Sequence, residues 1–277
     1  MRNENKKHRK IRKCVPGPSF AGQHLLHHPG TIRELIRLPR LSPGETVVEI
    51  GAGKGAITLP LLETGCRIVA VERDPQMVDY LREKIGDGYP LVIKSIDFRK
   101  MRLPEGPFCV VANIPFAITT EILERLLGEG GKRFERGALI MELGAARRFT
   151  AAYPSDPRVL AWQMNYRMTV RKTVPRSHFS PPPKVDAALV SLERRGDPQL
   201  AAGQHQRFRA FAGYLLRHAC EPLYEALRPV FTAEQIKRMM KQAGTDRDQS
   251  SARLSIRQWG ILFSAMLQYV PSHRWPR

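Results

Sequence analysis

The stretch that decides the fold runs from Val47 to Gly55 and reads VVEIGAGKG. It opens as a short apolar strand, beginning at Thr46, and leads directly into a turn that contains three glycines. Glycine adopts positive φ at no steric cost and lets a ligand lie against bare backbone. A strand that ends in such a turn is typical of an α/β domain that binds a nucleotide or nucleoside. A purely structural turn is the alternative interpretation.

Further strand-like segments follow at intervals that leave room for helices, and they cover residues 67–71, 91–93, 108–112 and 138–141. They are apolar runs without polar alternation, which indicates a parallel sheet buried on both faces. Residues 162–174 and 187–194 alternate in type and predict an antiparallel pair that closes the sheet. We therefore expect a Rossmann-like α/β domain with a mainly parallel sheet over residues 16–196.

The strand signals stop near Gly196, and the remainder of the chain is predicted to be helical. Apolar residues within 208–216 and within 256–266 recur at helical spacing. Thr232 and Gln235 match a capping box, and Gly244 is placed to end that helix. These signals predict a small all-helical domain over residues 197–277.

The charge of the chain points to a polyanionic partner. Its 277 residues include 45 Lys and Arg against 26 Asp and Glu, a formal net charge of +19. Nucleic acid is the first candidate for so basic a protein, and general solubility is the alternative. Residues 1–13 hold seven of the cations and one Glu, which favours a disordered basic arm over residues 1–15.

Several protein classes do not fit the sequence. It contains no apolar run of about 18 residues, and its basic start lacks the apolar stretch of a secretory signal. The four cysteines are far apart and show no CxxC spacing, which argues against a zinc site or a disulfide framework and fits a reducing compartment. We therefore expect a cytoplasmic monomer that binds no metal and contacts no membrane.

An acidic residue and the glycine turn together predict a nucleoside cofactor. Glu72 closes the second predicted strand, where a carboxylate can accept hydrogen bonds from ribose hydroxyls. The glycine spacing is GxGxG, and no Ser or Thr follows Lys54, so a nicotinamide oxidoreductase and a P-loop both fit poorly. The pattern suits S-adenosylmethionine, which has no pyrophosphate. Asp97, after the third strand, would contact the adenine of the cofactor or cap a helix.

A second motif, Asn113-Ile114-Pro115-Phe116, follows the strand at 108–112, at the edge where α/β sheets bind ligands. The exocyclic amine of a base is a poor nucleophile because its lone pair is delocalised into the ring. The side-chain carbonyl of Asn113 and the backbone carbonyl of Ile114 would favour the pyramidal nitrogen that attacks. Pro115 keeps Ile114 extended and offers no competing N–H, and Phe116 offers a stacking face. The alternative interpretation is that residues 113–116 form an ordinary loop without a role in ligand binding.

These motifs, together with Gln23 and residues 179–186 (FSPPPKVD), resemble the rRNA adenine N6-dimethyltransferases. The resemblance covers most of residues 18–195 and, more loosely, the helical end. Two branches share the motifs, namely the Erm methylases of large-subunit rRNA and the small-subunit rRNA dimethylases. Ile114, the segment Leu192-Glu193-Arg194-Arg195, the basic arm and Gln258-Trp259 are more similar to the Erm branch, since the other branch usually has Leu at position 114.

The resemblance also implies the residues of the site. The cofactor pocket would be lined by His24, Leu26, Gly51, Gly53, Glu72, Asp97 and Asn113. Phe116 and Phe179 would sandwich a flipped adenine, because the three prolines after Phe179 favour a rigid, exposed presentation, with a core position as the alternative. Where the family has Gln-Asn-Phe, this chain has Gln23-His24-Leu25, in which His24 would still hydrogen-bond the cofactor carboxylate.

The resemblance implies transfer of methyl groups from S-adenosylmethionine to N6 of an adenine in the peptidyl-transferase loop of 23S rRNA. In the family this modification confers resistance to macrolide, lincosamide and streptogramin B antibiotics. The alternatives are a 16S rRNA dimethyltransferase of ribosome maturation and a non-catalytic nucleic-acid-binding relative, against which the intact motif at 113–116 argues. Phosphate contacts are expected from cations at positions 147, 148, 167, 171, 172, 176, 207, 209 and 217.

Overall fold

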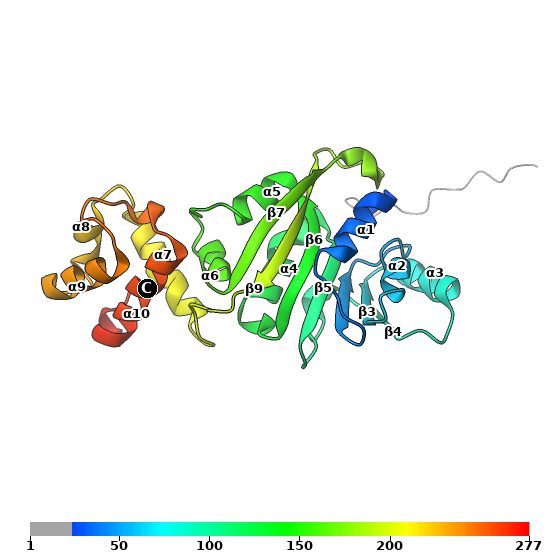
Figure 1. Ribbon diagram of the computed structural model, residues 1–277, viewed down its shortest axis with the longest axis horizontal. Helices are drawn as coiled ribbons and strands as arrows, with labels where there is room; N and C mark the ends of the chain where they lie inside the picture. The colour runs from blue at the N-terminus through cyan, green and yellow to red at the C-terminus, as the bar shows by residue number, and fades with distance from the viewer. Residues whose placement is uncertain (1–23, 277) are drawn as a thin grey trace, which may run out of the picture.

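A computed structural model describes residues 24–276, so the predicted basic arm over residues 1–15 and Gln23 lie outside the described residues. The described chain has a seven-stranded sheet covered by helices and a group of helices at its C-terminal end, on the left of Figure 1. The predicted Rossmann-like α/β fold and the helical C-terminal region are both confirmed.

Five parallel strands make up most of the sheet. They are β2 (Thr46–Ile50), β3 (Arg67–Glu72), β4 (Leu91–Ser95), β5 (Phe108–Asn113) and β6 (Phe134–Glu142). Two antiparallel strands, β9 (Ala187–Arg194) and β7 (Tyr166–Val174), complete the order β4-β3-β2-β5-β6-β9-β7. The sequence therefore predicted the five parallel strands and the presence of an antiparallel closing pair.

The beginning of that closing pair was predicted wrongly, because residues 162–165 are helical. They belong to α6 (Pro157–Asn165), which starts where the Asp156 carboxylate accepts a hydrogen bond from the N–H of Arg158. Pro157 suits the first helical turn because its missing N–H needs no partner there. Residues 159–165 are all buried, so this helix has no polar face to reveal its 3.6-residue period.

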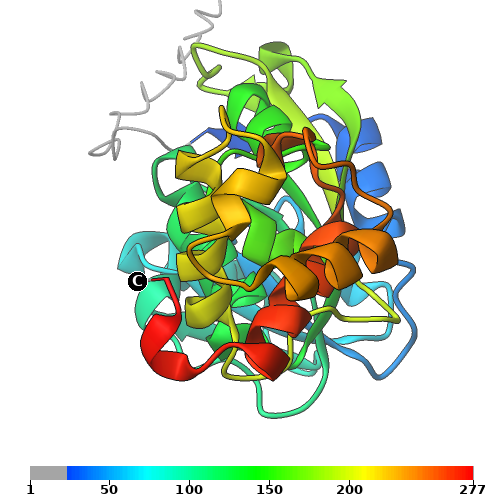
Figure 2. The same cartoon turned by 90° about the vertical axis from the view of Figure 1, so that its left-hand side faces the viewer.

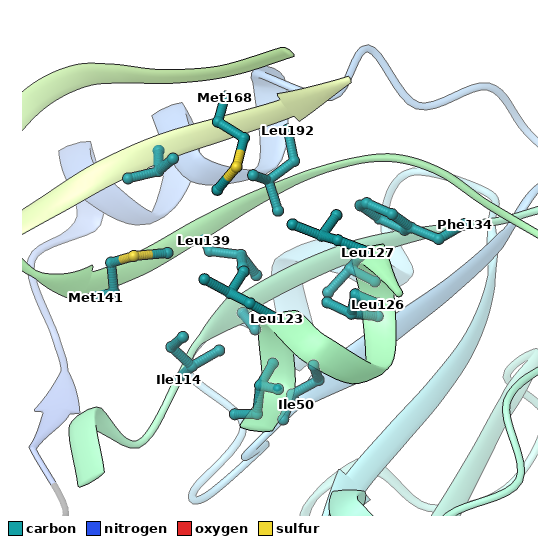
Figure 3. Close-up of a cluster of buried hydrophobic side chains, with 14 of the residues drawn as sticks. Ile50, Ile114, Leu123, Leu126, Leu127, Phe134, Leu139, Met141, Met168 and Leu192 are labelled. Atoms are coloured by element: carbon teal, nitrogen blue, oxygen red, sulfur yellow. The ribbon is translucent and has the colours of Figure 1, made fainter. Parts of the chain in front are cut away.

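Helices cover both faces of the sheet. α1 (Pro29–Arg37), α2 (Thr58–Leu62) and α3 (Pro75–Ile85) pack on one face, and α4 (Thr119–Leu127), α5 (Leu143–Phe149) and α6 pack on the other. Neighbouring strand residues alternate between the two layers, so Val47 faces the first group and Val48 the second. Figure 3 shows the second layer, where Leu123 of α4 lies near Ile114.

The C-terminal region consists of four α-helices and short 3₁₀ turns. The helices are α7 (His205–Arg217), α8 (Leu223–Leu227), α9 (Ala233–Ala243) and α10 (Ile256–Tyr269). The predicted capping box of Thr232 and Gln235 starts α9, and Gly244 ends it with a left-handed φ of 62°. Figure 2 looks onto these helices, which lie in front of the sheet in that view.

Helix α6 joins the helical region to the sheet. Its Val159 and Trp162 belong to the core against the sheet, whereas Leu160, Ala161 and Met164 belong to the core of the helical region. The packing therefore crosses the boundary that the sequence suggested at residue 196. No helix among residues 24–276 is long and apolar enough to cross a membrane.

A two-stranded sheet lies beside the carboxyl edge of the large one. It pairs β1 (Leu25–Leu26) with β8 (Phe179–Ser180), so that Leu26 lies opposite Phe179 and Leu25 opposite Ser180. The N–H of His27 extends the pairing by donating to the carbonyl of His178, 3.0 Å away. This pairing brings the start of the described chain next to the segment that carries Phe179.

Candidate active site

A cavity opens at the carboxyl ends of β2, β3 and β5, where the strand order reverses. From β2 the sheet continues through β3 and β4 on one side, while β5 and β6 lie on the other. Open α/β sheets bind ligands at such switch points. The cavity has a volume of about 710 Å³, part of it open to solvent. Its lining combines apolar side chains with a few polar groups, as is typical of small-molecule sites.

Most of the predicted site residues line this cavity, namely His24, Gly51, Gly53, Glu72, Asp97 and 113–116. Leu26 does not, because it is 3% exposed and packs in the core beneath α1. Side chains alternate along a strand, so Leu25 faces the cavity in its place. Sequence reasoning also missed six residues at or beyond strand ends, and that position is the signal that could have found them. They are Ile50, Val71, Arg73, Ile96, Phe98 and Ile118.

The glycine turn needs its glycines for two different reasons. Gly51, Gly53 and Gly55 have φ values of 75°, 52° and 80°, which side chains disfavour. A Cβ on Gly53 would lie 3.0 Å from the side chain of Leu25, at the cavity wall. A Cβ on Gly55 would lie only 2.6 Å from Leu81 of α3. Gly51 and Gly53 therefore keep backbone open to the cavity, whereas Gly55 lets the turn pack against a helix.

Glu72 is a buried carboxylate that the backbone holds in place. Its Oε2 accepts the N–H of Gly53 at 2.9 Å, and its Oε1 accepts the N–H groups of Arg73 and Asp74 at 2.8 and 3.0 Å. A carboxylate has about four acceptor positions, so about one remains for a ligand. The sequence suggested contacts to both ribose hydroxyls, whereas this arrangement has room for one.

A second buried carboxyl, Glu49, lies in β2 just before the glycine turn and does not line the cavity. It is 1% exposed, and neither oxygen makes a well-formed hydrogen bond with the described residues. Burial raises the pKa of Glu49 to about 8; the nearby Thr58 offsets part of this rise and the charge of Glu72 adds to it. Glu49 is therefore mainly protonated, and neutral, at pH 7.

Asp97 fits both of the roles that the sequence allowed. It lines the cavity, and its carboxylate also caps the turn η1 (Phe98–Lys100) by accepting the N–H of Arg99 at 2.9 Å. The Arg99 guanidinium lies 2.6 Å from Oδ2 and lowers the pKa of Asp97 to about 2. The carboxylate is consequently ionised throughout the neutral range and positioned by its own turn.

Asn113 is the most informative residue of the site. Its Nδ2 donates to the backbone carbonyl of His24 over 2.7 Å, which fixes the orientation of the amide. Its Oδ1 is buried and has no hydrogen-bond partner among the described residues. The N–H of Ile114 donates to the carbonyl of Ile140 at 3.1 Å, and the Ile114 side chain is 1% exposed, so the backbone at this point is anchored. The site thus offers a fixed acceptor with no internal donor.

Phe116 provides the aromatic surface of the cavity. It begins the turn η2 (Phe116–Ile118), is half-buried, and its ring centroid lies 5.9 Å from that of His24. The Thr119 hydroxyl donates to the Phe116 carbonyl at 3.0 Å and secures this turn at the start of α4. A flat ligand in the cavity would therefore find an aromatic ring next to the Asn113 amide.

Phe179 is not presented as the sequence suggested. It is 2% exposed, belongs to the core beneath α1, and is not among the residues that line the cavity. Its pairing with Leu26 in the small sheet holds it there, and this pairing outweighs the effect of the three prolines that follow. The expected exposed presentation is therefore wrong, and stacking on Phe179 would require the β8 segment to move.

The cations proposed for RNA differ in their surroundings. Lys172 pairs with Glu34, Arg209 pairs with Glu124, and Arg207 lies over the ring of Trp275. By contrast, Arg147 and Arg176 are exposed, with side chains that form no ion pair among residues 24–276. They follow β6 and β7, which places them near the same carboxyl edge as the cavity. No group of three or more metal-ligating side chains is found within that range.

Comparison with known proteins agrees with this geometry. The family described as "Ribosomal RNA adenine dimethylase" matches residues 18–267. The rRNA adenine N-6-methyltransferase of Bacillus licheniformis is 39% identical over 278 residues, covering 100% of this chain and 97% of the relative. The protein of the same name from Bacillus anthracis is 38% identical with the same coverage.

A solved structure leads to the same family. The crystal structure of the 23S rRNA methyltransferase ErmE matches with a TM-score of 0.73 and 25% identity, covering 88% of this chain and 100% of ErmE. The match over residues 18–267 and the two Bacillus relatives confirm the resemblance that the motifs suggested. The chain is thus an enzyme that belongs to the ribosomal RNA adenine dimethylase family.

Proposed function

We propose that this protein transfers methyl groups from S-adenosylmethionine to N6 of an adenine in the peptidyl-transferase loop of 23S rRNA. In a cell, this modification would confer resistance to macrolide, lincosamide and streptogramin B antibiotics. The protein would act in the cytoplasm as a monomer. The observation that carries the proposal is the buried, unpartnered Oδ1 of Asn113 at the cavity that Phe116 also lines, at the switch point of the sheet.

The residues of the cavity fit S-adenosylmethionine. Positive φ at Gly51 and Gly53 keeps backbone open to the cavity, and Glu72 retains about one acceptor position for a ribose hydroxyl. Asp97, which follows β4, and His24 both line the cavity, and we assign them contacts with the adenine and the carboxylate of the cofactor, respectively. When bound, S-adenosylmethionine supplies a methyl group on a positively charged sulfur, which is open to attack by a nucleophile.

The acceptor side of the site explains how a weak nucleophile would react. An adenine N6–H that donates to Asn113 Oδ1 would shift electron density towards a pyramidal nitrogen. Because Nδ2 is held by the His24 carbonyl, the amide cannot rotate to present its donor instead. Oδ1 is buried in the free protein, so a small local movement would bring it into contact with N6. The backbone carbonyl of Ile114, anchored through its own N–H, would accept the second N6–H.

The remaining steps need little from the protein. Phe116 would stack on the target base, and such contacts contribute about 1–3 kcal/mol. Pro115 has no N–H, so the peptide between Ile114 and Pro115 presents only an acceptor, the Ile114 carbonyl. The methylated nitrogen is acidic and loses its proton to water, so we assign no general base. Phe179 would complete a sandwich only if β8 moves away from Leu26.

Two observations support 23S rRNA as the substrate. The chain has Ile114 where the small-subunit branch usually has Leu, and it carries the Leu192-Glu193-Arg194-Arg195 segment of the Erm branch. ErmE, a 23S rRNA methyltransferase, matches over 88% of this chain. Bases with accessible edges occur in single-stranded RNA loops rather than in duplexes, so we expect the target adenine in a loop.

The direct test is to incubate protein-free 23S and 16S rRNA separately with the enzyme and labelled S-adenosylmethionine, and to map the product by primer extension. We expect label in 23S rRNA and a stop at one adenine of the peptidyl-transferase loop. The Asn113→Ala variant serves as the inactive control. Label in 16S rRNA alone would assign the protein to the small-subunit branch, and no label in either RNA would indicate a non-catalytic relative.

A further inference from the structure

The start of the described chain is joined to the segment that carries Phe179 by very little backbone pairing. β1 and β8 contain two residues each, and one further hydrogen bond runs from the N–H of His27 to the carbonyl of His178. An isolated pair of strands is at best marginally stable in water. Side chains around the pair therefore determine how firmly β8 is held.

Histidines supply these side-chain contacts on both sides of the short sheet. Before it, Nδ1 of His24 donates to the carbonyl of Pro181 at 2.8 Å, since a carbonyl can only accept. After it, the rings of His28 and His178 stack, with centroids 3.8 Å apart and planes 8° from parallel. The Thr31 hydroxyl bridges these two rings, because it lies 3.2 Å from Nδ1 of His28 and 2.9 Å from Nδ1 of His178. We call His24, His28 and His178 the histidine clasp.

The stack at the end of the clasp favours uncharged rings. Nδ1 of His28 accepts the N–H of Thr31 at 3.2 Å and thereby caps α1. A protonated imidazole has no acceptor for this N–H, and its charge would face the positive end of the α1 dipole. Two protonated rings in one stack would also repel each other. Protonation of His28 or His178 therefore opposes the closed arrangement.

The charges around His178 act in the same direction. The groups that set them come from several segments: His27 and His28 of the first described segment, Glu34 of α1, Lys172 of β7, and Arg176 and Asp186 beside the turn η4 (Arg176–His178). Burial lowers the pKa of His178 below its usual 6.5, and the positive charges of His28, Lys172 and His27 lower it further. Glu34 offsets these charges only in part, because it pairs with Lys172.

The contacts of the clasp reach two parts of the active site. We propose that the histidine clasp is a pH-sensitive fastening that positions β8 and the adjoining cavity wall, and that protonation of His28 and His178 releases β8. His24 and Leu25 line the cavity, so release would loosen its wall. It would also free Phe179 from its pairing with Leu26. A role for Phe179 at the target base rests on the proposed function, whereas the clasp itself is testable in the free protein.

The direction of the pH effect follows from proton linkage. His178 has a lower pKa in the closed clasp than in water, so the open form binds more protons. The closed form is fully favoured above pH 6.5 and loses this advantage as the pH falls from 6.5 to the lowered pKa of His178. A single proton can raise the opening equilibrium constant by up to about tenfold at a pH one unit below 6.5.

The test is hydrogen exchange followed by NMR on the free, full-length protein at pH 7.5 and pH 5.5. The reporter is the N–H of His27, which bonds across the clasp to His178. We expect its protection, corrected for the intrinsic exchange rate, to fall several-fold and by up to about tenfold at the lower pH. The N–H of Leu223, which donates to the carbonyl of Gln249 at 3.0 Å in the helical region, should keep its protection.

Two results of this measurement would overturn the proposal. Constant protection at His27 would show that the clasp does not respond to protons. An equal loss at His27 and Leu223 would show that acid destabilises the whole protein. Titration of the His178 imidazole in the same samples is a further check that needs no variant, and a midpoint at or above pH 6.5 would contradict the proposal.

Variants then assign the effect to the two stacked rings. His28→Asn/His178→Phe keeps a side-chain acceptor at the N-cap and an aromatic face, but neither side chain titrates. We expect His27 protection in this variant to be the same at both pH values. The matched control, His218→Asn/His273→Asn, removes two histidines of the helical region and should retain the full loss at pH 5.5. Loss of protection that persists in the first variant, or that disappears in the control, would overturn the assignment.

The exchange measurement is independent of the reaction. If His27 protection depends on pH as expected but neither rRNA is methylated, the clasp stands and the proposed function is wrong. If 23S rRNA is methylated but His27 protection is constant, the proposed function stands and the clasp is wrong.

Discussion

Two asparagines at opposite ends of the catalytic region show how this molecule separates structure from function. Asn165 ends α6 at the junction with the helical region. Its Oδ1 accepts the N–H of Leu200 at 3.0 Å, and its Nδ2 donates to the carbonyl of Leu200 at 3.0 Å and to His205. Asn113 ends β5 at the cavity, and only its Nδ2 has a partner, whereas its Oδ1 is buried with none.

The difference follows from the cost of burying polar atoms. Almost all buried polar groups in folded proteins are hydrogen-bonded, because an unpaired one costs about 1–3 kcal/mol. Asn165 meets this rule within the protein and thereby fixes the connection between two cores. Asn113 breaks it at the end of a central strand, where strand order reverses and ligands bind. The satisfied amide of Asn165 therefore connects two parts of the fold, and the unsatisfied amide oxygen of Asn113 lies where we propose that the ligand binds.

The largest expected effect is on the chemistry at Asn113. We expect Asn113→Ala to reduce single-turnover methylation by about 100- to 1000-fold, the usual cost of removing one hydrogen bond that stabilises a transition state. Stability should change by no more than about 1 kcal/mol, since the variant loses one hydrogen bond and one unpaired acceptor together. Rapid-quench methylation of 23S rRNA and urea denaturation measure the two quantities. Full turnover by the variant would show that another group orients N6.

The opposite pattern is expected at Asn165. Asn165→Ala leaves the N–H and carbonyl of Leu200 without partners, so we expect a loss of about 2–3 kcal/mol in the free energy of unfolding. Methylation per folded molecule should stay within a few-fold of the unchanged protein below the unfolding transition. Urea titration followed by circular dichroism gives the first quantity, and active-site titration gives the second. A variant that is stable but inactive would remove the contrast between the two residues.

Glu72 lies between these two cases, because it is mostly but not fully satisfied. Glu72→Gln removes the charge and about half of the acceptor positions, so the backbone donors and a ribose hydroxyl would compete for what remains. Hydrogen bonds to charged groups contribute about 1.5–3 kcal/mol, which predicts a 10- to 100-fold loss of S-adenosylmethionine affinity. Calorimetry on the folded variant measures it. Unchanged affinity would mean that Glu72 serves only the turn.

The sequence predicted the features that depend on local signals. The glycine turn, the five parallel strands and the capping box of α9 each have a short pattern with one physical meaning, and all are found. The prediction from sequence was wrong where contacts with distant residues determine the local structure. Residues 162–165 lack a polar face because two cores enclose α6, and nothing within the segment reveals the second core.

The same limit applies to the site. Glu72 and Asn113 could be found because they end strands, and strand ends converge at one edge of a parallel sheet. The sequence could not show that Leu25 rather than Leu26 faces the cavity, since that depends on the register of β1 against β8. Nor could it show that three backbone donors already occupy Glu72, because Gly53, Arg73 and Asp74 converge only in the folded turn.

Glu49 is a test of the comparison between Asn113 and Asn165. Its carboxyl oxygens have no hydrogen-bond partner among the described residues, yet it does not line the cavity. Its pKa of about 8 in the folded protein exceeds the usual 4.5, so the folded state keeps a proton that the unfolded state releases between these values. The stability contributed by this proton is present below pH 4.5 and is lost as the pH rises through 8.

We therefore expect Glu49→Gln, which carries no titrating proton, to gain stability relative to the unchanged protein by about 2 kcal/mol between pH 6 and pH 8. Urea denaturation of both proteins at the two pH values measures this difference. A constant difference would mean that Glu49 is ionised in the folded protein and has a donor. It would then be a satisfied group like Asn165.

The smallest expected effects on stability and turnover are at Phe116 and Phe179. Like the two asparagines, one of them lies at the cavity and the other serves the structure. Phe116 is half-buried at the cavity, whereas Phe179 is buried opposite Leu26. Phe179→Leu should lower the free energy of unfolding by about 1 kcal/mol, as near-isosteric core changes do, with turnover reduced less than threefold. Phe116→Leu should leave stability nearly unchanged and raise the KM for RNA, because a stacking face contributes about 1–3 kcal/mol to base binding. Steady-state methylation and urea titration of both variants separate the two roles. If Phe179→Leu instead lowers turnover more than Phe116→Leu at unchanged stability, β8 must open during the reaction, and a buried aromatic would then be part of the adenine site.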